Sequence, residues 1–590
     1  MIAFPFAELR PGQDRIIKEA ESAVKNGDKL MLHASTGMGK TAPVLYGALK
    51  AATERGSRVV FLTARHTHQN IVYDTLKKIN SVSSDKTVFT GINGKRSMCL
   101  FENSVEPSVF IEFCRAVREQ DMCDFYSNTF SKSKDVKAPA NQALSSDISD
   151  PASIIDVSRE YKVCPYEISL LNAKKSKVIV ANYSHIFDQD VAPSFMAKVG
   201  IDPKNTVLIV DEAHNLHNRI MDMNSFSIST RTLERAYNEA SLAGESPLAR
   251  KIDGLISESR SIKTERTLDL TGVFSLSDIE IMDAVIKNSE NANGYNVPAM
   301  FTVKKFASFL LKADESYLQY ASMDGDRVKF NIMALDPSGY SGKMIESFAS
   351  SILISGTFKP MDVFADLLGI PSAKKVIIED DAQANNRLVI NETDLTSKFS
   401  SRSHQFELIA ERIDDLLENF RHNSIIFFTS YYFMESIYKL VKNRDKIIKE
   451  KPNMGRDEKS SLISELSKPR KSLFAVIGGS FSESIGIRNN MIKMIAIVGI
   501  PFEPPSVRLK ALQDYYQKKF SNGFEYAQAL PAMVKTMQAA GRGIRSSKDR
   551  AVVVLIDSRF DSPVFRKFLP EGVKIVNGSP IRVIDADGFN

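Results

Sequence analysis

A glycine-rich run between two apolar segments has the residues needed to hold phosphate groups. It reads Ala34-Ser-Thr-Gly-Met-Gly-Lys-Thr41, after the apolar segment 30–33 and before the helical pattern 42–55. Backbone N–H groups of such a loop turn inward around phosphate oxygens, Lys40 can neutralise the β- and γ-phosphates, and Thr41 can ligate Mg²⁺. We predict a nucleotide site formed by Ser35, Thr36, Gly37, Met38, Gly39, Lys40 and Thr41. The alternative is a glycine-rich turn that caps a helix.

A second run, Val207-Leu-Ile-Val-Asp-Glu-Ala-His214, is an apolar strand that ends in two adjacent carboxylates. Parallel sheets present ligand-binding side chains at the carboxyl ends of their strands. We predict that Asp211 holds Mg²⁺, through water, and that Glu212 orients or deprotonates the attacking water. Taken alone, the same string is also compatible with an acidic helix N-terminus.

A third run, Gln538-Ala-Ala-Gly-Arg-Gly-Ile-Arg545, places Arg542 and Arg545 three residues apart, on one helical face. Two guanidinium groups from a second domain can reach a γ-phosphate and stabilise the charge of the transition state. Gln538, Arg542 and Arg545 are therefore candidate catalytic residues. The alternative is a solvated basic helix end.

The four cysteines of the chain all lie in its first third, as Cys99, Cys114, Cys123 and Cys164, with 14, 8 and 40 residues between successive members. Structural zinc sites usually carry close cysteine pairs, which this spacing lacks, whereas iron–sulfur ligands come from separate elements as well. The spacing favours an iron–sulfur cluster modestly. Disulfides or free thiols remain the alternative.

Length and composition limit the class of protein. With 590 residues, 43% hydrophobic and 25% charged, the chain is expected to fold into several globular domains. Its net charge of +6 does not by itself indicate nucleic acid. No apolar run approaches the roughly 20 residues of a membrane span, and residues 1–10 lack a signal-peptide pattern, so we expect no membrane partner and a cytoplasmic location.

The elements that position these motifs read as strands of α/β domains, because short β-branched runs end in small or polar residues and precede helical patterns. We expect two doubly wound parallel sheets, with strands at 30–33, 59–63, 178–181, 207–210 and 352–355, and at 424–429, 473–477, 495–500 and 552–557. Two detours are too long for loops and predict inserted domains. The first, 81–177, holds the cysteines, and the second, 215–344, has the pattern of amphipathic helices.

In order and spacing, the motifs resemble superfamily 2 helicases of the DEAH-box type and, more narrowly, the XPD helicase family with its archaeal members. Besides the three runs above, the matching segments are Arg10-Pro-Gly-Gln13, Thr63-Ala-Arg-His-Thr-His-Gln69, Ser355-Gly-Thr-Phe358, Thr429-Ser-Tyr431 and Gly478-Gly-Ser-Phe-Ser-Glu483. One segment departs from the family: Gly486 stands where a carboxylate is usual, so no nucleotide or coupling contact is assigned there.

The resemblance implies two RecA-like motor domains around one ATP and Mg²⁺. Motor domain 1 would comprise 1–80, 178–214 and 345–372; the [4Fe–4S] domain 81–177; the helical Arch domain 215–344; and motor domain 2 373–590. It further implies that Gln13 reads adenine, that 355–357 couple hydrolysis to movement, and that Cys99, Cys114, Cys123 and Cys164 hold the cluster.

The implied substrate is single-stranded DNA at a fork or duplex junction, unwound with 5′ to 3′ polarity by a monomer in DNA repair, with or without other repair proteins. Lys95 and Arg96, with Tyr166, Phe125 and Tyr126, have the composition of a single-strand path. Arg65 and Gln69 match family positions that face the DNA backbone. The rival functions are a translocase or remodeller that unwinds poorly, and an ATP-gated nucleic-acid-binding scaffold.

Overall fold

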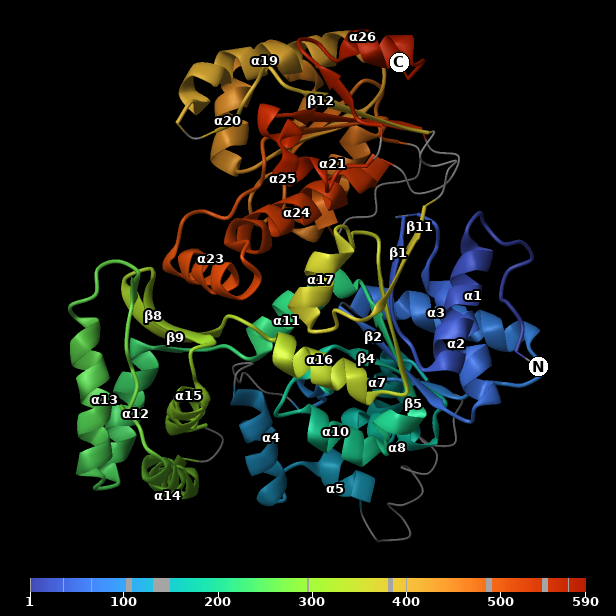
Figure 1. Cartoon of the computed structure of the whole chain (residues 1–590). Coiled ribbons are helices and arrows are strands. Elements are labelled where there is room, and N and C mark those ends of the chain that lie inside the picture. Colours follow the sequence, from blue (N-terminus) through green and yellow to red (C-terminus); the bar gives the residue numbers. More distant parts are fainter. Residues whose placement is uncertain are drawn as a thin grey trace.

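Parallel strands from distant parts of the sequence form the first of two large sheets in the computed structural model (Figure 1). The structure describes residues 2–589 except 36, 65, 102–108, 131–148, 294–296, 380–385, 399, 484–490, 544–549 and 571. Within these residues the first sheet has seven strands, in the order β11 (Lys374–Ile378), β1 (Lys29–Ala34), β10 (Ser350–Ser355), β5 (Thr206–Asp211), β2 (Arg58–Thr63), β4 (Val178–Asn182) and β3 (Phe89–Gly91).

Helices cover both faces of this sheet, which explains why its central strands are apolar along their whole length. Along β1, Leu30 and Leu32 pack into one core and Met31 into another, as the two-residue period of a strand requires. The first core is completed by α1 (Gln13–Asn26), α2 (Thr41–Glu54) and α3 (His66–Val82). The opposite face is covered by α9 (Ser184–Phe187), α10 (Ala192–Val199), α11 (Leu216–Met223), α16 (Ser338–Ser347) and α17 (Met361–Leu368).

The second sheet also has seven parallel strands among the described residues, all from residue 387 onward. Their order is β14 (Ile447–Lys449), β15 (Ser472–Val476), β13 (Ser424–Phe428), β16 (Met494–Val498), β17 (Ala551–Ile556), β12 (Arg387–Glu392) and β18 (Lys574–Val576). Its helices include α19 (Arg402–Asn419), α20 (Tyr431–Leu440), α21 (Arg456–Leu466), α23 (Val507–Phe520), α24 (Leu530–Ala540) and α26 (Ile581–Ala586). The predicted pair of doubly wound sheets is confirmed.

The first sheet is wider than predicted. Strand β3 lies inside the segment 81–177 assigned to the cysteine domain, and it pairs with β4. Strand β11 lies beyond residue 372, where motor domain 1 was expected to end, and it pairs with β1. Strands β3 and β11 both lie at an edge of the sheet. Strand β3 is short and β11 contains exposed as well as buried residues, so neither forms a continuous apolar run in the sequence.

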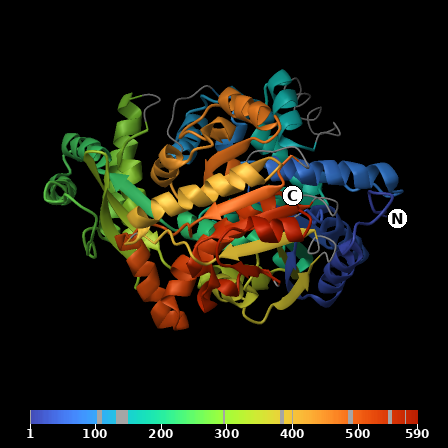
Figure 2. The same ribbon diagram turned by 90° about the horizontal axis from the view of Figure 1, so that it is seen from above.

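The sequence predicted helices for the second detour, 215–344, but this part of the chain also contains strands. It contains a four-stranded antiparallel sheet in the order β6 (Phe226–Ser229), β9 (Arg327–Ala334), β8 (Tyr317–Asp324) and β7 (Arg266–Thr267). Helices α12 (Thr230–Leu242), α13 (Ser246–Ser259), α14 (Leu276–Asn293) and α15 (Met300–Lys312) share a separate core with this sheet. The insert projects to one side of the two sheets in both views (Figures 1 and 2).

Short helices carry the cysteine segment. They are the 3-10 turn η1 (Lys95–Met98) and the helices α4 (Phe110–Glu119), α5 (Asp124–Phe130), α7 (Pro151–Glu160) and α8 (Pro165–Lys175). Two small apolar clusters hold them, one around Met98 and Val163 and the other around Phe110 and Phe113. In the part of the chain that the structure describes, the helices fall short of the length and hydropathy that a membrane span requires.

Candidate active site

The glycine-rich loop lies between β1 and α2, in the strand–loop–helix setting that the sequence predicted. Gly37 and Gly39 have φ values of 89° and 70°, which a side chain would make unfavourable. Lys40 and Thr41 stand at the N-terminus of α2, where backbone N–H groups favour an anion. The loop therefore has the geometry of a phosphate cradle. Thr36 lies outside the described residues.

Gln13 is buried against this loop. Its Nε2 donates to the carbonyl oxygens of Met38 (2.8 Å) and Gly39 (3.2 Å), and its Oε1 accepts from the backbone N–H of Arg10 (3.0 Å). Both ends of the amide are thus engaged by the chain itself, so Gln13 supports the phosphate loop here. Its role in reading adenine stays a prediction.

The paired carboxylates lie at the end of β5, as predicted. Asp211 is the last residue of the strand, and Glu212 adopts a left-handed conformation with φ 50°. The hydroxyl of Tyr183 donates to the carbonyl oxygens of Asp211 and Glu212 and so holds this turn. Burial and the neighbouring charge of Glu212 raise the pKa of Asp211, and Lys40 opposes that effect. A buried carboxylate of this kind fits Mg²⁺, which would supply the missing positive charge.

His214 connects the domains that contain the two large sheets. Gln538, on α24 between strands β16 and β17 of the second sheet, donates through Nε2 to Nε2 of His214 at 2.7 Å. The other ring nitrogen, Nδ1, is 2.7 Å from Oγ of Ser355 at the end of β10 and 3.3 Å from Oε2 of Glu212. Since Nε2 accepts, Nδ1 carries the proton and donates. The predicted segments at 211–214, 355–357 and 538 are therefore brought together at one point.

Arg542 lies just after α24, and its Nε donates to the carbonyl oxygen of Ser482 at 2.8 Å. Ser482 belongs to α22 (Ser480–Glu483), which follows the glycine loop after β15. The guanidinium is thus attached to the segment 478–483 of the same domain. Arg545 and Gly486 lie outside the described residues.

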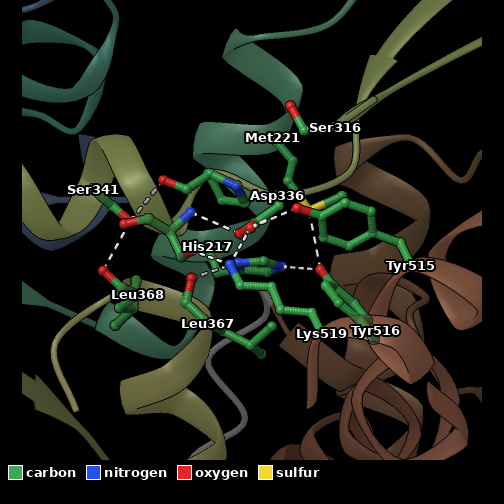
Figure 3. Close-up of polar contacts among 12 residues, drawn as sticks. His217, Met221, Ser316, Asp336, Ser341, Leu367, Leu368, Tyr515, Tyr516 and Lys519 are labelled. Atoms are coloured by element: carbon green, nitrogen blue, oxygen red, sulfur yellow. Dashed lines mark hydrogen bonds and ion pairs between the residues drawn. The ribbon is translucent and has the colours of Figure 1, made fainter. Parts of the chain in front are cut away.

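A second contact between the domains, lining the same cavity as the first, joins His217 and Tyr516 (Figure 3). Nε2 of His217, on α11, is 2.9 Å from the hydroxyl of Tyr516 on α23, and Nδ1 is 3.1 Å from the carbonyl oxygen of Leu367. Burial lowers the pKa of His217 to about 4, so the ring is neutral. Nearby, Asp336 accepts from Tyr515 (3.0 Å) and from Lys519.

The four cysteines line one cavity, with Phe101, Phe110, Tyr126 and Tyr166 among the other lining residues. They arrive from separate elements: Cys99 after η1, Cys114 on α4, Cys123 before α5 and Cys164 before α8. Within the described residues, no three His, Cys, Asp or Glu side chains are close enough to hold a single metal ion. The sulfur atoms that hold a four-iron cluster can lie farther apart than the ligands of a single metal ion, because each thiolate binds a different iron.

Burial controls the chemistry of these thiols. Burial raises the pKa of Cys164 to about 12. It also raises the pKa values of Cys99 and Cys123, and the nearby charge of Cys114 raises these two pKa values further. Thiolates in such surroundings require nearby positive charge, which iron would supply. The donor set therefore fits an iron–sulfur cluster.

The predicted DNA contacts divide into two groups. Lys95 lies over the ring of Tyr166, 5.3 Å from its centroid, and Arg96 is exposed, so the basic and aromatic residues do gather at the rim of the cysteine cavity. The role of Gln69 in contacting DNA stays a prediction. Its side chain is buried and its Nε2 donates to Oδ1 of Asn182 at 2.7 Å. Arg65 lies outside the described residues.

Sequence reasoning missed Tyr183, His217 and Tyr516. Tyr183 directly follows β4, and the carboxyl end of a parallel strand is itself a signal for a residue near the ligand. His217 and Tyr516 carry no such signal, because each belongs to an ordinary amphipathic helix.

Two family models match the chain. The model described as DEAD_2 matches residues 62–233, and the Helicase C-terminal domain matches residues 413–574. A similar curated protein is the ATP-dependent DNA helicase XPD of Sulfolobus acidocaldarius, 24% identical over 95% of this chain and 98% of that protein. The ATP-dependent DNA helicase CHL1 of Candida albicans is 21% identical over 88% of this chain and 73% of that protein.

Solved structures show the same fold. One titled XPD_Helicase superposes with a TM-score of 0.69 and 22% identity, covering 97% of this chain and all of the other. Another, the structure of S. tokodaii Xpd4, gives a TM-score of 0.63 with 16% identity over 96% of this chain. The pair of RecA-like sheets is therefore shared with these proteins.

Proposed function

Because this chain is an XPD-type superfamily 2 helicase in its motifs and fold, we propose that it is an ATP-dependent DNA helicase that moves 5′ to 3′ along single-stranded DNA, unwinds duplexes and acts in DNA repair. The observation that carries this proposal is the convergence of motor domain 1 and motor domain 2 on His214, through Ser355 at 2.7 Å and Gln538 at 2.7 Å. A residue held by both domains senses their relative position, which is what coupling hydrolysis to movement requires.

The nucleotide chemistry follows from the side chains around the phosphate loop. Lys40 binds the β- and γ-phosphates, and Thr41 and Asp211 hold Mg²⁺, which offsets the negative charge of the phosphates. Glu212 orients the attacking water and takes its proton. Arg542, and Arg545 by resemblance, stabilise the charge that develops on the γ-phosphoryl group.

The cysteine segment is proposed to hold a [4Fe–4S] cluster through Cys99, Cys114, Cys123 and Cys164. The cluster would tie η1, α4, α5 and α8 into one rigid unit. Lys95, Arg96 and Tyr166 at its rim would contact phosphates and bases of a single strand, without reading its sequence.

We propose the following division of the chain, with the sheet boundaries corrected as above. The first motor domain contains the first sheet, and the segment between β3 and β4 carries the cluster. Helices α11 and α16, at the two ends of the predicted Arch 215–344, pack in the core of the first sheet, so we assign them to the first motor domain and residues 224–335 to the Arch. The second motor domain follows β11. The Arch and the cluster segment would enclose the strand between them.

The test is ATP-driven strand displacement by anaerobically purified protein on duplexes with a 5′ overhang, a 3′ overhang or blunt ends. Unwinding of the 5′-tailed duplex alone supports the helicase and its polarity. ATP hydrolysis that displaces no strand would replace it with the translocase. Absence of DNA-stimulated hydrolysis would favour the binding scaffold.

A further inference from the structure

Glu450 is a buried carboxylate outside every segment considered so far. It directly follows β14 and accepts hydrogen bonds from the backbone N–H groups of Val476 (3.0 Å) and Ser480 (2.8 Å). A further backbone hydrogen bond comes from Phe481. Several N–H groups directed at one carboxylate are a strong arrangement, because each bond is charge-assisted. Glu450 therefore fixes the loop that follows β15.

The loop is shaped around this carboxylate. A Cβ atom at Gly479 would lie 2.7 Å from Oε1 and 2.8 Å from Oε2 of Glu450, and 2.9 Å from the carbonyl oxygen of Val476. Gly478 has a φ of 84°, which favours glycine. The two glycines thus let the backbone close on Glu450, and a side chain at 479 would push the carboxylate away.

The same loop contacts Arg542, which lies just after α24. Within it, Oγ of Ser482 accepts from the N–H of Gly478 and donates to the carbonyl oxygen of Gly479, both at 2.9 Å. The carbonyl oxygen of Ser482 accepts from Nε of Arg542 at 2.8 Å. A continuous set of hydrogen bonds therefore runs from Glu450 through the loop to this guanidinium.

We propose that Glu450 is a positioning residue for ATP hydrolysis, which holds the loop 478–482 and through it orients Arg542 toward the γ-phosphate. This inference rests on the proposed function, since it requires Arg542 to act in hydrolysis. Tyr431, at the start of α20, also forms a hydrogen bond with Glu450. The carboxylate thus joins the loops that follow β13 and β15.

The test is steady-state ATP hydrolysis, with saturating single-stranded DNA, by full-length Glu450→Gln. The amide keeps the size of the side chain but turns an N–H₂ group toward a backbone N–H, so the loop loses its fixed position. We expect kcat to fall about 10- to 100-fold, as for a displaced catalytic group, with KM for ATP changed less than about twofold. The matched control is Glu435→Gln, a half-exposed carboxylate paired with Lys449, which should leave both constants unchanged.

Two further variants separate positioning from a loss of folding. Gly479→Ala should reproduce the fall in kcat, because its Cβ displaces the same carboxylate. The double variant Glu450→Gln/Arg542→Ala should be no slower than Arg542→Ala alone if Glu450 acts through Arg542. Multiplicative losses in the double variant, or a normal kcat in Glu450→Gln and Gly479→Ala, would overturn the inference. A wild-type protein that hydrolyses no ATP would instead overturn the proposed function.

Discussion

The hydroxyl of Tyr516 donates to Nε2 of His217 across the boundary between the two motor domains, at 2.9 Å (Figure 3). Because Nδ1 of the same ring donates to the carbonyl oxygen of Leu367 at 3.1 Å, the neutral tautomer is fixed. His217 lies three residues after His214. The hydrolysis motif, through His214, and the helix that follows it, through His217, both contact motor domain 2.

Replacing Tyr516 with Phe should weaken this attachment. The ring remains, but Nε2 of His217 becomes a buried acceptor without its donor, which costs about 1–3 kcal/mol. We expect a lower thermal midpoint and weaker stimulation of ATP hydrolysis by single-stranded DNA. Tyr515→Phe is the matched control, because Asp336 keeps its contacts with Lys519 and the N–H of Ser338. If Tyr516→Phe and Tyr515→Phe had the same thermal midpoint and the same stimulation by DNA, the role assigned to the Tyr516 hydroxyl would be contradicted.

Lys40→Ala should abolish most ATP turnover. The loop keeps its backbone, but the charge on the β- and γ-phosphates is lost, and kcat should fall by about 10²- to 10³-fold or more. Circular dichroism and the visible absorption of the cluster should be unchanged. Turnover at the wild-type rate would refute the phosphate site.

Cys114→Ser should remove a cluster ligand while leaving the motor domains intact. We expect anaerobically purified protein to lose its visible absorption and strand displacement, yet to bind a fluorescent ATP analogue as wild type does. The control is Ser97→Ala, an exposed position on η1 near Cys99. If the absorption of Cys114→Ser matched wild type, Cys114 would not be a ligand.

Glu212→Gln should trap the ATP-bound protein on single-stranded DNA. Loss of a general base slows hydrolysis by about 10²- to 10⁴-fold, whereas phosphate binding through Lys40 and Thr41 is retained. The measurement is DNA retention by fluorescence anisotropy in the presence of ATP, beside the hydrolysis rate. Undiminished hydrolysis would exclude Glu212 from this role.

The buried histidines should contribute stability that decreases on acidification. Burial lowers the pKa values of His33, His185 and His217 to about 4, from about 6.5 in the unfolded chain. The unfolded chain therefore binds more protons, and this stability is complete above about pH 6.5 and is lost as the pH falls toward 4. Thermal midpoints at pH 7, 6 and 5 test this, and His185→Asn should show a weaker dependence. If the midpoint of His185→Asn depended on pH as steeply as that of the wild type, the buried neutral state of His185 would be contradicted.

The central strands and the phosphate loop could be predicted because local sequence carries their signal. Strands β2, β5 and β10 are buried on both faces, so their apolar runs are continuous. Edge strands such as β11 alternate between exposed and buried residues and were missed. Contacts such as Gln538 with His214 join positions 324 residues apart, which one sequence does not reveal.

The roles of buried polar residues are the hardest to predict from the sequence. Gln69 matches a family position that faces DNA, but here its amide is satisfied by Asn182 inside the first motor domain. Gln13 was likewise expected to face a ligand, and its amide holds the phosphate loop. A glutamine carries the same signal whether it faces a ligand or a backbone, so only the folded environment distinguishes the two.

The insert is attached where β6 and β9 pair, with Phe226 opposite Ile332 and the N–H of Ala334 donating to Oγ of Ser225 at 3.0 Å. The chain therefore leaves and rejoins the motor at neighbouring points, and a short turn could close that gap. Its interior packs around its own apolar residues. Such a module can lengthen, shrink or be exchanged by recombination while the motor keeps its fold, which makes this junction a natural site for grafting other domains.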